Sequence, residues 1–286
     1  MTATAASPAG MGRQSGRRDQ YLLGDSTAEV EHLAHQAEVY ADEAEQLLDL
    51  VGVAAGSSAI DVGCGVLGIL PLLCARAGAA GRVVGLERQT RILDAARQYA
   101  AERGLPVEFV QGDATSLDLP ADSFDFVHER TVLLNVHDPA TVIAEMVRIA
   151  RPGGVVALQE PDHSGWVCDP PHPAWDPLLA ELLAAYRRNG KNFNTGRRIA
   201  RALRDAGLTD VQVQVSARVT QAGEYYQTFL LTLTSLMRDQ IITGGRLTAA
   251  ELDGQVASLR AHLEKPGALT CMATMWQAWG TKPQAG

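Results

Sequence analysis

The ten residues AIDVGCGVLG, at positions 59–68, constrain the fold of this chain more than any other stretch. A short apolar run contains one acid, Asp61, and leads into three glycines at GxGxxG spacing, which are Gly63, Gly65 and Gly68. Glycine adopts backbone conformations that other residues avoid, and its bare backbone lets a ligand or a neighbouring element come close. The pattern predicts a buried strand that turns tightly into a helix, with a ligand site at the turn.

Strand and helix patterns alternate along the chain around this turn. Strands are predicted at 57–62, 81–87, 106–114, 123–129 and 155–161. Helices are predicted between them at 67–78, 90–104 and 139–154. Such alternation predicts a mostly parallel sheet with helices on both faces. We expect the helix at 139–154 to end at Pro152-Gly153-Gly154, directly before the strand at 155–161.

Strand patterns return late in the chain, after a helical region at 173–207. Residues 210–216 alternate strictly between apolar and polar, and 268–280 also have a strand pattern. These two strands are separated by helical residues, which predicts an antiparallel pair at one edge of the sheet.

Five parts of the chain follow from these patterns. They are a disordered tail (1–18), a helical lid (19–52), a ligand-binding core (53–221), a helical cap inserted before the last strand (222–264), and the last strand with the C-terminal residues (265–286). In the lid, Ser26 and Glu29 form a capping-box pattern at the start of a long helix. We expect that helix to break once near Asp42.

Charge and composition narrow the choice of partners. The formal net charge is −8, which disfavours a nucleic-acid partner held through its phosphates. The four cysteines lack the spacing of a metal site or a disulfide framework, so we expect no metal and a reducing, cytoplasmic location. No apolar stretch reaches the length of a membrane span, so we expect no membrane partner.

Acidic residues follow the predicted strands where a ligand would lie. Glu87 ends the second strand of the array and can accept hydrogen bonds from ribose hydroxyls, while Asp113 can meet an adenine edge. These features fit both NAD and S-adenosylmethionine (SAM). Asp61 favours SAM, because a carboxylate repels a pyrophosphate and attracts an ammonium or sulfonium group. The RPGG before the fifth strand and the late strand pair also differ from a dinucleotide fold.

Several motifs together resemble the class I SAM-dependent methyltransferases. They are IDVGCGVLG, Glu87, QGDA, SFDFVHERTVLLNV and EMVRIARPGGVVALQEPD, within residues 50–217. The resemblance implies an α/β, Rossmann-like fold with a seven-stranded, mostly parallel sheet whose last strand is antiparallel. It also implies SAM as the methyl donor.

The same resemblance implies a set of cofactor-binding residues. Asp61, Gly63 and Gly65 would hold the methionine part, and Glu87 would hold the ribose. The remaining positions are Arg88 or Gln89 beside the adenine, Gly112, Asp113 and Ala114 at its edge, and Glu129 and Arg130 beside the methyl-transfer centre. Val66-Leu67 departs from the family, which more often has a small polar residue there.

The acceptor is expected to be a hydrophobic small molecule. Aromatic and apolar residues predicted to line its pocket are Tyr21, Trp166, Tyr225, Phe229 and Leu233. His128 and His163 are candidate bases, with His137 and Asp162 as further ones, and Tyr21 is a candidate catalytic residue because a lid aromatic there would cover the methyl group.

The N-terminal DQYLLGDS and the long helix after it resemble small-molecule methyltransferases of secondary metabolism. Within them, the resemblance points to C-methylation of a prenylated indole alkaloid of the teleocidin type, with cyclisation driven by the resulting cation. O- or N-methylation of another secondary metabolite, or a non-catalytic SAM-binding module, remain alternatives. We also expect a homo-oligomer, with the N-terminal arm exchanged between subunits.

Overall fold

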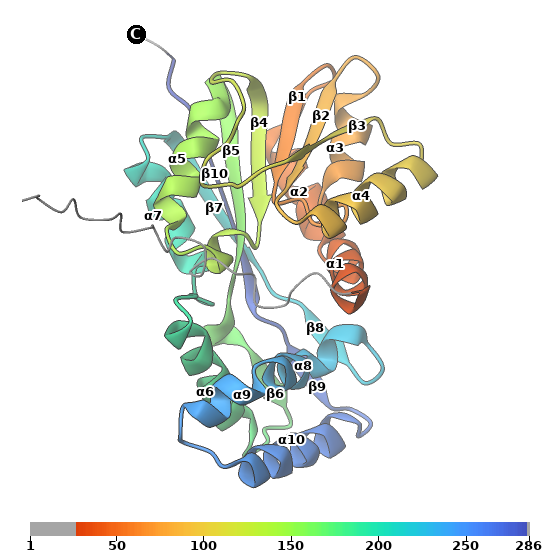
Figure 1. Cartoon of the computed structure of the whole chain (residues 1–286), viewed down its shortest axis with the longest axis vertical. Helices are drawn as coiled ribbons and strands as arrows, with labels where there is room; N and C mark the ends of the chain where they lie inside the picture. The colour runs from red at the N-terminus through yellow and green to blue at the C-terminus, as the bar shows by residue number, and fades with distance from the viewer. Residues whose placement is uncertain (1–26, 285–286) are drawn as a thin grey trace, which may run out of the picture.

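A computed structural model describes residues 27–284 of the chain. A core built on one large sheet forms the upper part of the molecule, and a helical cap forms the lower part (Figure 1). No helix within 27–284 has the length and apolar character needed to cross a membrane. The expected capping residue Ser26, the tail at 1–18 and Tyr21 lie outside the described residues.

The core sheet has seven strands in the order β3-β2-β1-β4-β5-β10-β7. Their bounds are β1 Ser58–Val62, β2 Arg82–Glu87, β3 Val107–Gln111, β4 Phe124–Arg130, β5 Ala150–Asp162, β7 Thr209–Ser216 and β10 Thr274–Thr281. The first five strands pair in parallel, whereas β10 runs antiparallel to both of its neighbours, β5 and β7. The predicted seven-stranded sheet with a reversed last strand is confirmed.

Helices cover both faces of this sheet, and apolar residues from alternate strand positions pack against them. On one face, α2 (Ala41–Val51) and α3 (Leu70–Ala77) pack on β1 around Ala59. On the other, α5 (Pro139–Ile149) and α7 (Ile199–Asp205) pack on Ile60 and Val127. The remaining core helix, α4 (Thr90–Glu102), contacts β2 and β3.

The boundary between α5 and β5 differs from the predicted one. The helix ends at Ile149 and the strand begins at once with Ala150, so Pro152-Gly153-Gly154 lies inside the strand. The register between β4 and β5 shifts here, with Ala150 opposite Phe124 and Val155 opposite Phe126. This register shift is a bulge, and it accommodates within the strand the residues that we predicted to end the helix. Gly153 has a positive φ at this bulge.

The cap contains four helices and a small second sheet. Its elements are α6 Trp175–Arg188, α8 Phe229–Leu236, α9 Arg238–Thr243, α10 Ala249–Leu263, and the antiparallel sheet β6-β9-β8 made of Val167–Asp169, Leu269–Cys271 and Val219–Gln221. Although 222–264 was the predicted cap, α6 joins it from within 53–221, because Leu178 and Leu182 share one apolar core with Leu230 and Leu259. The small sheet was not predicted, because three-residue strands carry too little sequence pattern.

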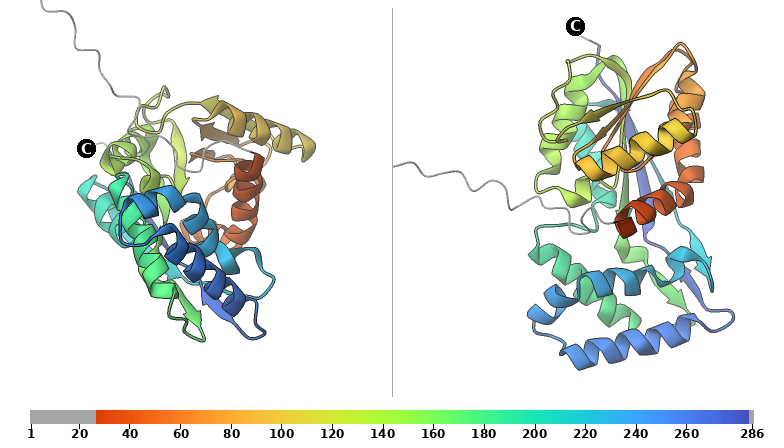
Figure 2. Two further views of the ribbon diagram at one scale, coloured as in Figure 1. Left: turned by 60° about the horizontal axis from the view of Figure 1, so that its bottom comes forward. Right: turned by 45° about the vertical axis from the view of Figure 1, so that its right-hand side comes forward.

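Short 3-10 turns connect these elements. They are η1 Leu133–Asn135, η2 His163–Gly165, η3 Gly196–Arg198 and η4 Tyr225–Thr228. The predicted N-terminal helix is broken at Tyr40, near the expected Asp42, into α1 (Thr27–Val39) and α2. Figure 2 shows α1 between the level of the core sheet and that of the cap, so it can contact ligands of either part.

Candidate active site

The first pocket lies beyond the carboxyl ends of β1, β2 and β4 and has about 970 Å³ of empty space, part of it open to solvent. Ten of the eleven residues predicted to bind the cofactor line it. They are Asp61, Gly63, Gly65, Glu87, Arg88, Gln89, Gly112, Asp113, Ala114 and Arg130. Residues far apart in the sequence meet here because parallel strands end at the same edge of the sheet.

The glycine loop after β1 is closely packed against its surroundings. Gly63 and Gly65 have φ values of 73° and 56°, in the left-handed region that favours glycine. A Cβ at Gly63 would overlap the Val132 side chain, whereas a Cβ at Gly65 would meet only the side chain of Leu33, at 3.6 Å. A Cβ at Gly68 would overlap the Asp61 carboxylate. Gly63 and Gly68 are therefore required by packing, and Gly65 leaves bare backbone toward the pocket.

Asp61 is fixed in place by a buried network. Its Oδ1 accepts a hydrogen bond from Nδ1 of His128 at 2.7 Å, and its Oδ2 accepts from the backbone N–H of Ile69 at 3.2 Å. The other ring nitrogen of His128 meets the side-chain amide of Gln159 at 3.0 Å. His128 is fully buried and lines neither pocket described here. In this arrangement His128 orients Asp61.

Glu87 is held by the backbone on both sides. Its carboxylate accepts from the N–H of Gly65 at 3.3 Å and from the N–H of Gln89 at 2.8 Å. Burial raises the pKa of Glu87, and these backbone hydrogen bonds partly oppose that rise. A carboxylate fixed at the end of β2 in this way is suited to accept hydrogen bonds from two neighbouring hydroxyl groups.

The second pocket lies between core, cap and α1 and has about 690 Å³ of empty space. Predicted residues that line it are Trp166, Phe229, Leu233 and His163. Tyr225, also predicted, is not among the lining residues. It is about half exposed, and its hydroxyl is 3.2 Å from Nδ1 of His32. Lining residues that the sequence did not indicate include Tyr40, Tyr186, Phe193, Tyr226 and Met272.

His163 is the imidazole of this second pocket whose ring orientation is set by the backbone. Its Nδ1 donates to the carbonyl of Phe193 at 2.7 Å. That contact leaves Nε2 as the nitrogen with the free lone pair. Burial lowers the pKa of His163 to about 4, so the ring is neutral near pH 7. The pKa of His32, on the α1 side of the pocket, is also lowered to about 4 by burial.

The two pockets share part of their walls. Gln36, Thr131 and Asn135 line both of them. Thr131 has a φ of 59°, which is rare for a residue with a branched side chain. The side-chain amide of Asn135 donates to the carbonyl of Thr131 at 2.9 Å. A strained residue at the junction of two pockets is typical of functional sites.

A buried pair of carboxyl groups lies beneath this junction. Glu129 accepts from the N–H of Val132 at 3.0 Å, and Glu160 accepts from the N–H of Leu133 at 2.6 Å. Burial raises the pKa of both groups, that of Glu129 to about 8, and the neighbouring Glu129 raises the pKa of Glu160 further. Glu129 was predicted beside the methyl-transfer centre but lines neither pocket. Together with Glu160, which was not predicted, it supports the loop that carries Thr131.

Three features of the fold and the site are typical of one class of protein: a Rossmann-like sheet with a reversed strand, a glycine loop after β1 and an acid at the end of β2. Comparison with known proteins identifies that class. The profile of a family described as a methyltransferase domain matches residues 60–158. A demethylmenaquinone methyltransferase of Geobacillus kaustophilus is 31% identical over 187 residues, which cover 59% of this chain and 78% of that protein. The chain belongs to the class I SAM-dependent methyltransferases.

Other similar proteins extend the comparison. An uncharacterized 37.1 kDa protein in transposon TN4556 of Streptomyces fradiae is 32% identical over 223 residues, which cover 75% of this chain and 62% of that protein. The chain thus spans less than two thirds of that relative. Among solved structures, YcgJ from Bacillus subtilis has a TM-score of 0.57 and 18% identity, covering 85% of this chain and 100% of that one. The [4+2]-cyclase SpnF has a TM-score of 0.50 and 19% identity, covering 85% and 81%.

Proposed function

We propose that this enzyme methylates a hydrophobic small molecule that binds in the second pocket, with SAM in the first. One observation carries the proposal: the two pockets meet at Gln36, Thr131 and Asn135. A donor and an acceptor bound on either side of these residues would lie next to each other. Methyl transfer is an in-line displacement that depends chiefly on such alignment and on the exclusion of water.

The residues of the first pocket suit the polar and charged groups of SAM. Asp61 offers a fixed carboxylate and Glu87 a second one, while Gly65 lines the pocket without a side chain. SAM supplies a methyl group bonded to a positively charged sulfur. A carboxylate that already accepts two hydrogen bonds from the protein needs little rearrangement to bind a ligand.

The residues of the second pocket suit an uncharged acceptor with aromatic or prenyl groups. Trp166, Phe229 and Leu233 provide an apolar surface, and both imidazoles in the wall are neutral near pH 7. His163 presents the Nε2 lone pair to a proton that must leave the acceptor. Because its pKa is low, it is suited to a strongly acidic proton, such as one beside a carbocation.

For the acceptor itself, we favour C-methylation of a prenylated aromatic compound. The curated relatives named demethylmenaquinone methyltransferases support an acceptor of this kind. The teleocidin-type prenylated indole alkaloid is our specific hypothesis, since an alkene carbon methylated there would give a cation whose proton His163 can accept. O- or N-methylation of another secondary metabolite is the alternative with the same pocket.

The deciding experiment uses SAM with a deuterated methyl group and a panel of prenylated indoles, prenylated quinols and simple phenols. We expect a mass increase of one labelled methyl group in a prenylated acceptor, located on carbon by fragmentation. Label on oxygen or nitrogen would favour the alternative acceptor class. Calorimetry with S-adenosylhomocysteine separates failure of the donor site from failure of the acceptor panel.

A second candidate function comes from the structural neighbour SpnF, whose name gives it as a [4+2]-cyclase. Proteins of this fold thus include one that is named for a reaction other than methyl transfer. A chain that binds S-adenosylhomocysteine and converts an acceptor without incorporating label would support this second function.

A further inference from the structure

His163 stands where the core sheet continues into the cap. The strand β5 ends at Asp162, and the chain enters the cap through η2. Residues 190–198, which we call the return segment, lead back from α6 of the cap to α7 of the core. Asp162 and Asn194 form an antiparallel bridge, so the return segment runs beside the crossing point of β5.

Three hydrogen bonds join His163 to the return segment. Its backbone N–H donates to the Phe193 carbonyl at 3.2 Å and to Oδ1 of Asn194 at 3.1 Å. Its ring Nδ1 donates to the same Phe193 carbonyl at 2.7 Å. The position of one carbonyl therefore decides which ring nitrogen of His163 carries the proton.

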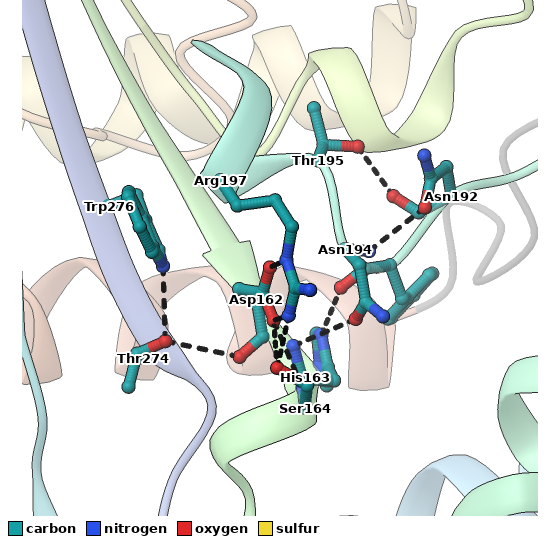
Figure 3. Close-up of polar contacts among 10 residues, drawn as sticks. Asp162, His163, Ser164, Asn192, Asn194, Thr195, Arg197, Thr274 and Trp276 are labelled. Carbon is teal, nitrogen blue, oxygen red and sulfur yellow. Dashed lines mark hydrogen bonds and ion pairs between the residues drawn. The ribbon is translucent and has the colours of Figure 1, made fainter. Parts of the chain in front are cut away.

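An ion pair fixes the return segment at its other end. The Arg197 guanidinium donates to both carboxylate oxygens of Asp162, with Nη2 2.7 Å from Oδ1, and also contacts the hydroxyl of Ser164 (Figure 3). The Asp162 side chain is buried, and it also accepts from the N–H and O–H of Ser164 at 3.1 and 2.6 Å. A two-point contact between guanidinium and carboxylate fixes orientation as well as distance.

The Asp162 carboxylate is ionised at neutral pH. Burial acts to raise its pKa, but the hydrogen bonds from Arg197 and Ser164 outweigh burial and lower it. Asp162 directly precedes His163, and Arg197 lies four residues beyond Phe193. The ion pair thus closes a short loop around the contact between the Phe193 carbonyl and His163.

We propose that the Asp162–Arg197 ion pair is a positioning pair, which keeps His163 as the Nδ1–H tautomer with the Nε2 lone pair available to the acceptor pocket. The use of that lone pair in methyl transfer rests on the proposed function, whereas the tautomer follows from the contacts alone.

Other contacts retain the fold when the ion pair is lost. The ring of Phe193 stacks on Tyr186 with centroids 3.6 Å apart, and Lys191 donates to the backbone carbonyl of Asn135. These contacts hold the start of the return segment, and beside the Phe193 carbonyl the Asp162–Asn194 bridge and the backbone hydrogen bonds of His163 remain. With the carbonyl held less firmly, the His163 ring can also carry its proton on Nε2, and the pocket then offers a hydrogen-bond donor in place of an acceptor.

The test is nuclear magnetic resonance of protein with ¹⁵N-labelled histidine at pH 7, without any acceptor. His163→Gln assigns the ring signals of His163 by their loss. In the unsubstituted protein we expect His163 as the Nδ1–H tautomer alone. In Arg197→Gln we expect a substantial population of the Nε2–H tautomer, and in Arg197→Lys an intermediate population, because lysine restores the charge but not the two-point contact.

Arg201→Gln is the matched control. Arg201 lies on α7 four residues away, is exposed, and pairs with the exposed Asp205 at 3.5 Å. We expect it to leave the tautomer unchanged. The affinity for S-adenosylhomocysteine should change less than about threefold in every variant, because neither Asp162 nor Arg197 lines the first pocket.

The proposal is overturned if His163 stays entirely Nδ1–H in Arg197→Gln, or if the unsubstituted protein already shows the Nε2–H form. Where Arg197→Gln does not fold, Ser164→Ala, which removes one shared contact of the pair, is judged by the same two criteria. Because no step of this test involves methyl transfer, failure of the proposed function leaves its result intact.

Discussion

Nδ1 of His128 lies 2.7 Å from Oδ1 of Asp61, and both side chains are buried. The imidazole comes from the strand next to the one that carries the carboxylate, at the register position directly opposite. A residue that looks from the sequence like a base beside the site is, in the fold, the partner of a cofactor-pocket carboxylate.

Replacing His128 with glutamine should therefore weaken cofactor binding. Loss of the hydrogen bond to Asp61 is expected to raise the Kd for S-adenosylhomocysteine about tenfold, by calorimetry. His137→Gln is the matched control, since His137 lines neither of the two pockets of the site. An unchanged Kd in a folded His128→Gln protein would contradict this role.

Glu87→Gln should also weaken binding of S-adenosylhomocysteine, again about tenfold, because an amide presents one accepting oxygen where the carboxylate presents two. Glu108→Gln serves as its control. Glu108 lies on the neighbouring strand, is exposed, and pairs with Arg82 outside the pocket. Equal effects of the two substitutions would show that Glu87 does not contact the ligand.

Phe229→Ala should affect the acceptor and spare the cofactor. Phe229 lines the second pocket only, so we expect the KM for an acceptor identified with labelled SAM to rise about tenfold or more. The Kd for S-adenosylhomocysteine should stay within about twofold. Leu236→Ala, on the exposed side of the same helix, should change neither value.

The contribution of His163 to stability should fall as the pH is lowered from about 6.5 to about 4. In this range the unfolded chain binds a proton at His163 while the folded chain, with a pKa of about 4, does not. The loss from this one residue is on the order of 3 kcal/mol. Urea unfolding at both pH values should show a smaller loss for His163→Gln than for the unsubstituted protein.

The buried carboxyl pair acts in the opposite direction, and its contribution to stability falls as the pH rises from about 4.5 to about 8 and above. Glu129 and Glu160 have raised pKa values, so the folded chain retains protons that the unfolded chain releases above about 4.5. The stabilising contribution of Glu129 is lost as the pH rises through about 8. Glu160→Gln keeps the shape without the charge, and we expect its melting temperature to decrease less than that of the unsubstituted protein between pH 6 and pH 9. Equal decreases would show that the pair does not titrate in this range.

The fold and the cofactor pocket were largely predictable because their determinants are local. Gly63 and Glu87 can be recognised from their positions at the end of a strand pattern, and parallel strands bring such positions together. The acceptor pocket depends instead on contacts between distant segments. Tyr225 shares a helical face with Phe229 by spacing, yet it begins η4 rather than α8 and turns toward α1.

Glu160 and Arg197 illustrate what no sequence pattern could indicate. Glu160 sits in an apolar strand and becomes important only through Glu129 on the adjacent strand and the backbone of Leu133. Arg197 is one of several arginines in a helical region, and its role arises from the end of β5, 35 positions earlier. Partners at such separations are set by the tertiary fold.

The position of β10 has a consequence for how the protein is made. It lies between β5 and β7, although it is the last of the sheet strands to leave the ribosome. Until residues 274–281 have been synthesised, β5 exposes an unpaired edge and β7 has no neighbour on which to align. The edge of β5 in the nascent chain therefore stays unpaired while the residues between β7 and β10 are translated. During this period a chaperone can bind the unpaired edge.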